Sequence, residues 1–279
     1  MTARPLHDHS RLSINDATTK AQWTLEQAIQ GYSAQGVRGI SVWRDKLAEC
    51  GVPRAAALLA DHGMTVTGLC RGGMFPAPTA VERRAAIDDN RRAIEEAVAI
   101  GAQCLVLVAG GLPKGAKDLV GARMMVQDGI AAVLEEARAA GMPLAIEPLH
   151  PMYAADRCCI NTMAQANDLC DRLGPGVGIA VDVYHVWWDP DLDRQIRRAG
   201  KDRLLAFHIC DWLIPTRDLL LDRGMMGDGI IDIPLIRGWV EEAGYEGFHE
   251  VEIFSAETWW KRDPNEVVTV CKERYLTVV

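Results

Sequence analysis

The sequence has no excess of basic residues, no long apolar run and no CxxC pair. A formal net charge of −8 disfavours a nucleic-acid partner, because duplex-binding surfaces are basic. No apolar stretch reaches the roughly 18 residues of a membrane span, and the start, MTARPLHDHSRLS, lacks the apolar centre of a signal peptide. Eight scattered cysteines favour reduced thiols over a disulfide framework. We therefore expect a cytoplasmic protein that binds neither nucleic acid nor membranes.

Apolar residues make up 49% of the chain, enough for a large core, and they gather in eight short runs. The runs are nearly continuous, as in parallel strands covered on both faces, and a helical pattern follows each. They lie at residues 11–15, 37–43, 65–70, 104–111, 143–149, 177–185, 204–211 and 248–254. Eight such units predict an α/β fold, a single-domain (β/α)8 TIM barrel over residues 1–279. An open doubly wound sheet is disfavoured, because INDATTK stands where a glycine-rich fingerprint would follow the first strand.

Ligand-type side chains stand at the ends of four consecutive predicted strands, where a barrel of this kind builds its site. They are Glu147, Asp182, His208 and Glu252. Three converging carboxylates would repel one another without a cation, which favours one divalent ion bound by all four residues. Oxygen and imidazole ligands suit Mn²⁺ first, with Mg²⁺, Co²⁺ or Zn²⁺ as alternatives. Glu250 lies deeper in its strand, and we expect it to be a hydrogen-bonding partner of this site.

Further polar and aromatic residues follow the strand ends and are candidates for substrate binding. His185 is either a substrate contact or a capping histidine. Tryptophans after the strands, including Trp43, Trp188 and Trp212, either stack on a sugar ring or form an interface between subunits. The segment 214–233 has no period and is expected to be an active-site loop. Its Arg217 and Arg223 either meet a substrate or remain solvated, and we name Arg217 as the candidate.

The motifs AIEPL, VDVYH, FHICDW, GDGIIDIP and GYEGFHEVEIFS, in this order, resemble the xylose isomerase-like TIM-barrel superfamily, which contains sugar phosphate isomerases and epimerases. The resemblance covers nearly the whole chain. It implies that Glu147, Asp182, His208 and Glu252 bind one divalent metal and that His185 touches substrate oxygens. It also implies that Glu147 removes a proton beside a ketose carbonyl and Glu252 returns one. Dimers and tetramers are common in the resembled family, so we expect a homo-oligomer.

The chain departs from the epimerases of that superfamily at two places. Tyr153 stands about where they carry a further glutamate, and Arg217 comes late after His208. The expected function is thus a metal-dependent isomerase or epimerase of a sugar, sugar phosphate or keto-polyol, whose individual substrate stays open. A keto-sugar or keto-inositol dehydratase is the alternative, since it begins with the same proton abstraction. An endonuclease for abasic DNA is disfavoured by the acidic charge, and a non-catalytic sugar-binding barrel by the intact ligand set.

Overall fold

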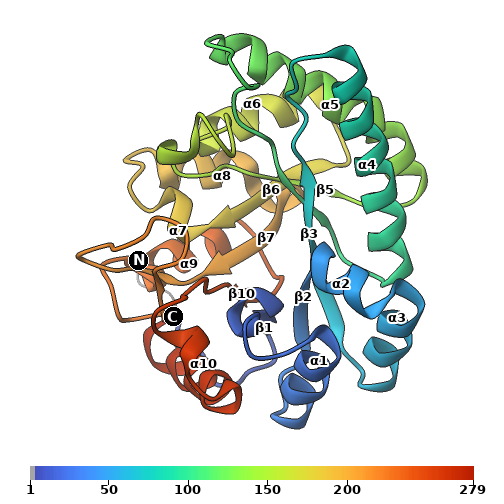
Figure 1. Ribbon diagram of the computed structural model, residues 1–279. Helices are drawn as coiled ribbons and strands as arrows, with labels where there is room; N and C mark the ends of the chain where they lie inside the picture. Colours follow the sequence, from blue (N-terminus) through green and yellow to red (C-terminus); the bar gives the residue numbers. More distant parts are fainter. Residues whose placement is uncertain (1–3) are drawn as a thin grey trace.

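Eight parallel strands close into a barrel in the computed structural model, which describes residues 4–279 (Figure 1). In order around the barrel they are β1 (Leu12–Asn15), β2 (Gly39–Trp43), β3 (Thr65–Gly73), β4 (Leu105–Val108), β5 (Leu144–Glu147), β6 (Val177–Asp182), β7 (Leu204–Ile209) and β10 (His249–Val251). The strands are almost completely buried, as continuous apolar runs predict. The predicted (β/α)8 barrel is therefore confirmed.

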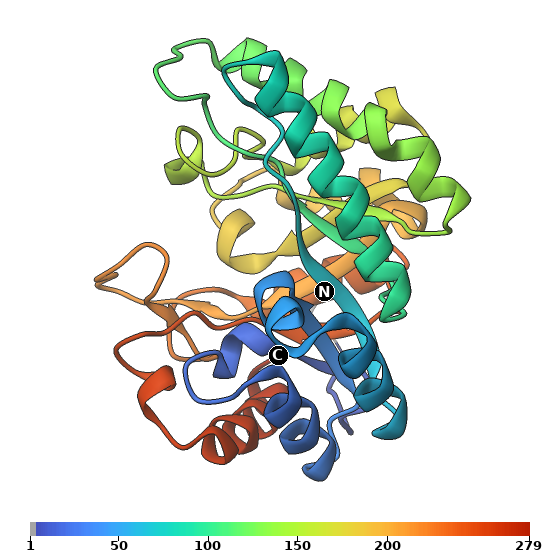
Figure 2. The same cartoon turned by 45° about the vertical axis from the view of Figure 1, so that its right-hand side comes forward.

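Helices surround the barrel on its outside (Figures 1 and 2). They are α1 (Leu25–Ala34), α2 (Arg44–Cys50), α3 (Val52–Asp61), α4 (Ala80–Ala99), α5 (Leu119–Ala139), α6 (Met163–Leu173), α8 (Leu192–Arg203), α9 (Ile233–Glu242) and α10 (Pro264–Val278). The short helix α7 (Val183–Val186) instead follows β6 at the C-terminal end of the barrel and is buried. Short 3₁₀ turns are η1 (Asp16–Thr19), η2 (Pro151–Tyr153) and η3 (Trp259–Lys261). None of the helices in residues 4–279 combines the length and apolarity that a membrane crossing requires.

The first helix begins later than its amphipathic pattern predicts. The pattern starts at Lys20, whereas α1 starts at Leu25. Thr24 accepts a hydrogen bond from the Gln27 backbone and the Gln27 side chain accepts one from the Thr24 backbone, which makes a capping box. This cap satisfies the first free N–H groups of the helix and so determines where it begins.

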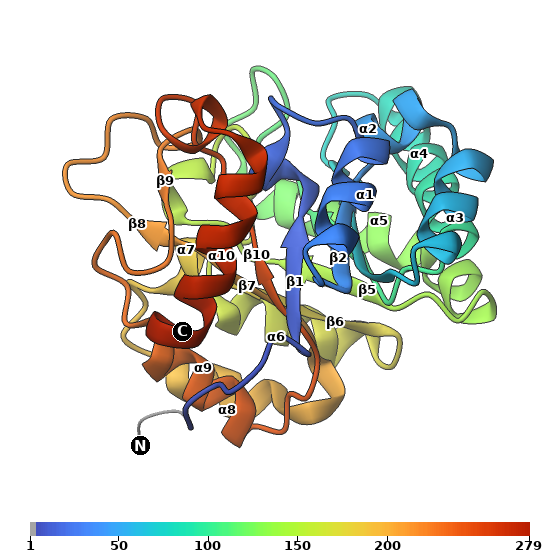
Figure 3. The same ribbon diagram turned by 90° about the horizontal axis from the view of Figure 1, so that it is seen from below.

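The segment between β7 and α9 is the long loop that the sequence predicts, and it projects from the barrel (Figures 2 and 3). It contains a small antiparallel hairpin of β8 (Asp211–Trp212) and β9 (Arg223–Gly224). The Asp211 carboxylate accepts hydrogen bonds from the backbone N–H groups of Trp212, Gly227, Gly229 and Ile231 at 2.8–3.0 Å. This single side chain therefore ties the far half of the loop to the end of the barrel.

Candidate metal centre

Four side chains meet at the C-terminal end of the barrel, one from each of four neighbouring strands. Glu147 ends β5, Asp182 ends β6, His208 lies in β7 and Glu252 directly follows β10. Each offers one ligand atom, and these atoms all lie within 4.8 Å of one another. All four side chains are buried. The structure thus brings together the four residues that the sequence analysis grouped, while their binding of an ion stays a prediction.

His208 is oriented by carboxylates on both sides of its ring. Its Nδ1 lies 3.1 Å from Glu147 Oε1, and its Nε2 lies 3.5 Å from Glu250 Oε1. Glu250 is in turn held by Asn15 Nδ2, which donates to Oε1 at 2.8 Å, and by Thr67 Oγ1, which donates to Oε2 at 2.9 Å. A histidine that ligates a metal commonly has such a carboxylate behind it. Here the arrangement directs Nδ1 toward the other three ligand residues.

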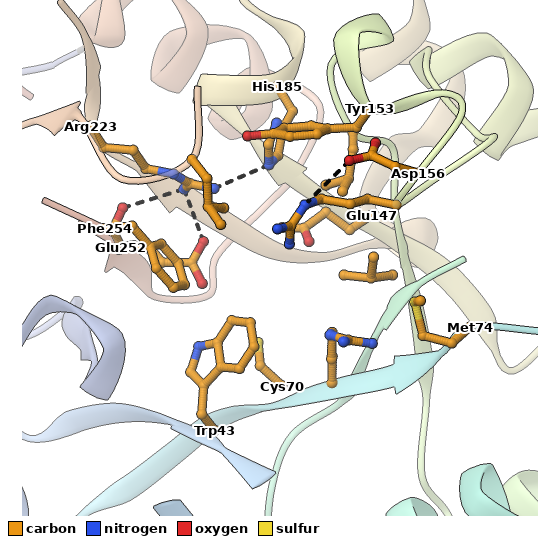
Figure 4. A pocket seen from close by; sticks show the side chains of 15 residues that line it. Trp43, Cys70, Met74, Glu147, Tyr153, Asp156, His185, Arg223, Glu252 and Phe254 are labelled. Atoms are coloured by element: carbon orange, nitrogen blue, oxygen red, sulfur yellow. Dashed lines mark hydrogen bonds and ion pairs between the residues drawn. The ribbon is translucent and has the colours of Figure 1, made fainter. Parts of the chain in front are cut away.

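Arg223 supplies a buried positive charge beside the same carboxylates. Its Nη1 donates to Asp182 Oδ2 at 2.9 Å. The same nitrogen donates to Glu252 Oε2 at 3.1 Å (Figure 4). Burial raises the pKa of Glu252 to about 8, although Arg223 opposes the shift. Burial also acts to raise the pKa of Asp182, but Arg223 and the nearby histidines outweigh it, and that pKa is lowered. Burial therefore favours the protonated form of Glu252 when no cation is bound.

The donor set fits a divalent cation. Four buried carboxyl groups, those of Glu147, Asp182, Glu250 and Glu252, lie beside one arginine, Arg223, and the imidazoles of His185 and His208 in the described part of the chain. A cation at this place would counteract the burial and the carboxylate repulsion that raise the pKa of Glu252. The four ligand atoms lie within 4.8 Å of one another, close enough that these side chains would hold one ion between them. Among residues 4–279 this is the single group of such ligands.

A cavity of about 340 Å³ opens above these residues, a size that suits a small ligand. Glu147 and Glu252 line it, together with Arg223, His185 and Trp43 (Figure 4). The His185 Nε2 lies 3.1 Å from Arg223 Nη2 and must accept there, because arginine only donates. Burial lowers the pKa of His185 to about 3, so its imidazole is neutral. Two of the predicted substrate residues, Trp43 and His185, are thus placed at the cavity.

The structure does not bring Trp188, Trp212 or Arg217 to the cavity. The Trp188 Nε1 donates to the His185 carbonyl at 2.8 Å and so supports the backbone of that residue. The Trp212 ring packs against Tyr184, with 4.7 Å between ring centroids. Arg217 pairs with Asp222 in its own loop, and 54% of its side chain is exposed. These three residues follow strand ends in the sequence, but local packing directs their side chains elsewhere.

Arg223 is the site residue that sequence reasoning passed over in favour of Arg217. Its position in the chain carries little signal, because the loop before it has no periodic pattern. The informative feature is the hairpin in which Asp211 of β8 pairs with Gly224 of β9. This pairing returns the chain to the end of the barrel at Arg223 and Gly224. That pairing becomes visible only in three dimensions.

Comparison with known proteins gives one family and close structural relatives. Residues 31–268 match the family described as xylose isomerase-like TIM barrel. The crystal structure of protein SMc04130 from Sinorhizobium meliloti 1021 has a TM-score of 0.96 and 59% sequence identity, covering 97% of this chain and 99% of that one. Inosose isomerase of Bacillus velezensis is 24% identical over 96% of this chain and 97% of its own. The structure of the IOLI protein with a binding zinc atom has a TM-score of 0.84 at 21% identity, over 96% and 98% of the two chains.

Proposed function

The chain belongs to the xylose isomerase-like TIM-barrel family, and we propose that it is a divalent-metal-dependent isomerase or epimerase of ketoses or keto-polyols. The observation that carries the proposal is the placement of two glutamates, Glu147 and Glu252, at one cavity and one candidate metal centre. Their strands, β5 and β10, are separated in the barrel by β6 and β7, so the carboxylates approach from different sides. Two opposed carboxylates serve a reaction that removes a proton on one side and returns it on another.

In this proposal Glu147 takes the proton from the carbon beside the substrate carbonyl. Glu252 then gives a proton to the opposite face of that carbon, which yields an epimer. Alternatively, it gives the proton to the former carbonyl carbon while the hydroxyl proton of the first carbon passes to the former carbonyl oxygen, which yields an isomer. A bound divalent cation would polarise the carbonyl and stabilise negative charge on its oxygen. Arg223 and His185 line the same cavity, and we assign them hydrogen bonds to substrate oxygens.

We propose Mn²⁺ as the ion, with Mg²⁺, Co²⁺ and Zn²⁺ as alternatives, because three carboxylates and one imidazole suit all four. We also propose that the protein works in the cytoplasm as a homodimer or homotetramer. All eight cysteines are free thiols, which supports a reducing compartment. Ile214, Leu219 and Ile230 are large exposed apolar side chains of the long loop, and they support an interface between subunits there.

Hydrogen exchange at the substrate tests the proposal directly. The Mn²⁺-loaded protein is incubated in D₂O with a panel of ketoses, keto-inositols and sugar phosphates, and each compound is followed by NMR. We expect deuterium beside the carbonyl of at least one compound, together with its epimer or isomer, and neither change with EDTA-treated protein. Loss of water from the labelled compound would identify a dehydratase instead. Failure of every ketose to exchange would remove the proposed proton transfer.

A further inference from the structure

The cavity is lined by two positive side chains that the proposed proton transfer does not use. Arg71 belongs to the C-terminal part of β3, and Arg157 belongs to the loop between η2 and α6. Both line the cavity that contains Glu147, Glu252 and Arg223. The cavity therefore has an acidic floor, where the candidate ligands lie, and arginines in its wall.

Arg71 is placed there by an irregularity of the barrel. In the pairing of β3 with β4, Cys70 faces Val106 and Gly72 faces Leu107, so Arg71 is the extra residue of a β-bulge. Bulges are frequent beside active sites because they redirect one side chain out of the regular alternation. The bulge presents a charged side chain to the cavity at a strand position next to Cys70, which is buried.

Within residues 4–279, Arg71 has no ion-pair partner, although a largely enclosed arginine ordinarily has one. No carboxylate among residues 4–279 lies within 4.0 Å of its guanidinium nitrogens, and no described group accepts a hydrogen bond from them. Burial lowers its pKa, and repulsion from Arg157 adds to the shift. Arg44, the first residue of α2 directly after the neighbouring strand β2, is by contrast paired with both Asp89 and Glu96. An arginine left unpaired in a cavity is an open site for an anion.

Arg157 is held at the mouth of the same cavity. Its guanidinium carbon lies 5.7 Å from the centre of the Tyr153 ring, a cation–π distance. The Tyr153 hydroxyl donates to the Leu219 carbonyl at 2.5 Å, which anchors the ring. The only carboxylate partner of Arg157 in the described part of the chain is its neighbour Asp156, at 4.0 Å, a weak pair at the surface.

We propose that Arg71 and Arg157 form a subsite for an anionic group, a phosphate or a carboxylate, at the end of the substrate remote from the reacting carbon. This inference rests on the proposed function, because the floor of the cavity must receive the ketone and its neighbouring hydroxyl groups. The substrate class is then an acidic keto-sugar or keto-polyol, and not a neutral one. Arginine suits both anions, since its planar guanidinium donates two parallel hydrogen bonds to either.

A matched series of ligands tests the subsite. D-Fructose, D-fructose 6-phosphate and D-fructuronate share the ketone end and differ in the group at the far end. Their dissociation constants are measured by calorimetry with and without Mn²⁺, so that direct binding of the anion to the ion is recognised. Deuterium incorporation from D₂O is measured in parallel. The variants are Arg71→Gln, Arg71→Lys and Arg157→Gln, with Arg194→Gln, an exposed arginine on α8, as the control.

We expect at least one anionic ligand to bind about tenfold more tightly than fructose. Arg71→Gln and Arg157→Gln should each remove most of this preference, Arg71→Lys should retain part of it, and Arg194→Gln should change nothing. The subsite is overturned if all three ligands bind equally, or if the preference for the anionic ligand persists in both Arg71→Gln and Arg157→Gln. Either result holds even if deuterium exchange is normal. A preference that depends on the arginines supports the subsite even if no ligand exchanges, and in that case only the proposed reaction fails.

Discussion

His208 and Glu250 are direct partners across the pairing of β7 and β10, and a Glu250 oxygen lies 3.5 Å from His208 Nε2. The contact keeps the other ring nitrogen toward Glu147 and the candidate ion. Asn15 and Thr67 hold Glu250 in place by hydrogen bonds, so the orientation of the imidazole is supported from two further strands.

Glu250→Gln should lower the affinity for Mn²⁺ by about 10- to 100-fold, the usual effect of losing a carboxylate behind a ligating histidine. The glutamine amide keeps the shape of the side chain but is uncharged, so it cannot balance positive charge on the His208 imidazole. Calorimetric titration of the EDTA-treated variant measures the change. Unaltered Mn²⁺ affinity would show that Glu250 serves the fold alone.

Glu147→Gln should reduce deuterium incorporation into the substrate, and Glu252→Gln should reduce formation of the epimer or isomer, each by about 10²- to 10⁴-fold, the range for loss of a general acid or base. Both side chains are buried but sit at a cavity, so an isosteric amide should leave the fold intact. Circular dichroism and thermal unfolding check the fold, and NMR measures the exchange. Full exchange in Glu147→Gln, or full product formation in Glu252→Gln, would remove that glutamate from the proposed proton transfer.

Removal of the ion should abolish exchange and lower the unfolding temperature. Binding of Mn²⁺ at 100 times its dissociation constant adds about 2.7 kcal/mol to the free energy of unfolding. For a chain of this size, each kcal/mol changes the unfolding temperature by about 2–4 °C. Scanning calorimetry before and after EDTA treatment, and after Mn²⁺ is restored, measures the effect. A chelated protein with unchanged stability and exchange would exclude a bound metal.

The four grouped residues could be found from the sequence because each ends an apolar run. Parallel strands of a barrel end at one rim, so Glu147, Asp182 and His208 must lie near one another once the strand count is known. Glu252 follows from the same rule, although the strand itself stops one residue earlier, at Val251. The positions of the strand ends in the sequence are therefore sufficient to predict most residues of the candidate metal centre.

The loops could not be predicted in this way, because nothing periodic relates their residues to the barrel. Arg223 reaches the site only through the hairpin of β8 and β9, and Arg71 reaches the cavity only through a bulge in β3. Conversely, Trp212 follows a strand end but packs on Tyr184. Whether a side chain after a strand turns inward depends on the local backbone, which the composition of a run does not determine.

Asp211→Asn should loosen the loop that carries Arg223. One Asp211 oxygen accepts from the N–H groups of Gly227 and Gly229, and an amide nitrogen in its place cannot accept. We expect a loss of about 1–3 kcal/mol in the free energy of unfolding and a lower kcat. Hydrogen exchange of the two glycine amides should become faster. Asp232→Asn at the start of α9 is the control, since asparagine caps a helix equally well.

Asp16 should make the protein less stable as the pH rises. Burial raises the pKa of its carboxyl group to about 8, although the Trp43 N–H, a hydrogen-bond donor to it, opposes the shift. The unfolded chain releases this proton near pH 4. Between about pH 4 and pH 8 the folded state thus holds a proton that the unfolded state lacks. Each pH unit in this window then costs up to about 1.4 kcal/mol of stability, and the loss ends above pH 8.

Asp16→Asn removes the titration while keeping an oxygen to accept from Trp43. The difference in free energy of unfolding between the variant and the native protein should grow from pH 5 to pH 8 and then level off. Urea unfolding at each pH measures this difference, and other titrating groups cancel because both proteins contain them. Asp193→Asn, at an exposed position on α8, should show no such trend. Parallel curves for native protein and Asp16→Asn would mean that the buried carboxyl group ionises normally, with its charge stabilised by Lys20, Lys46 and the Trp43 N–H.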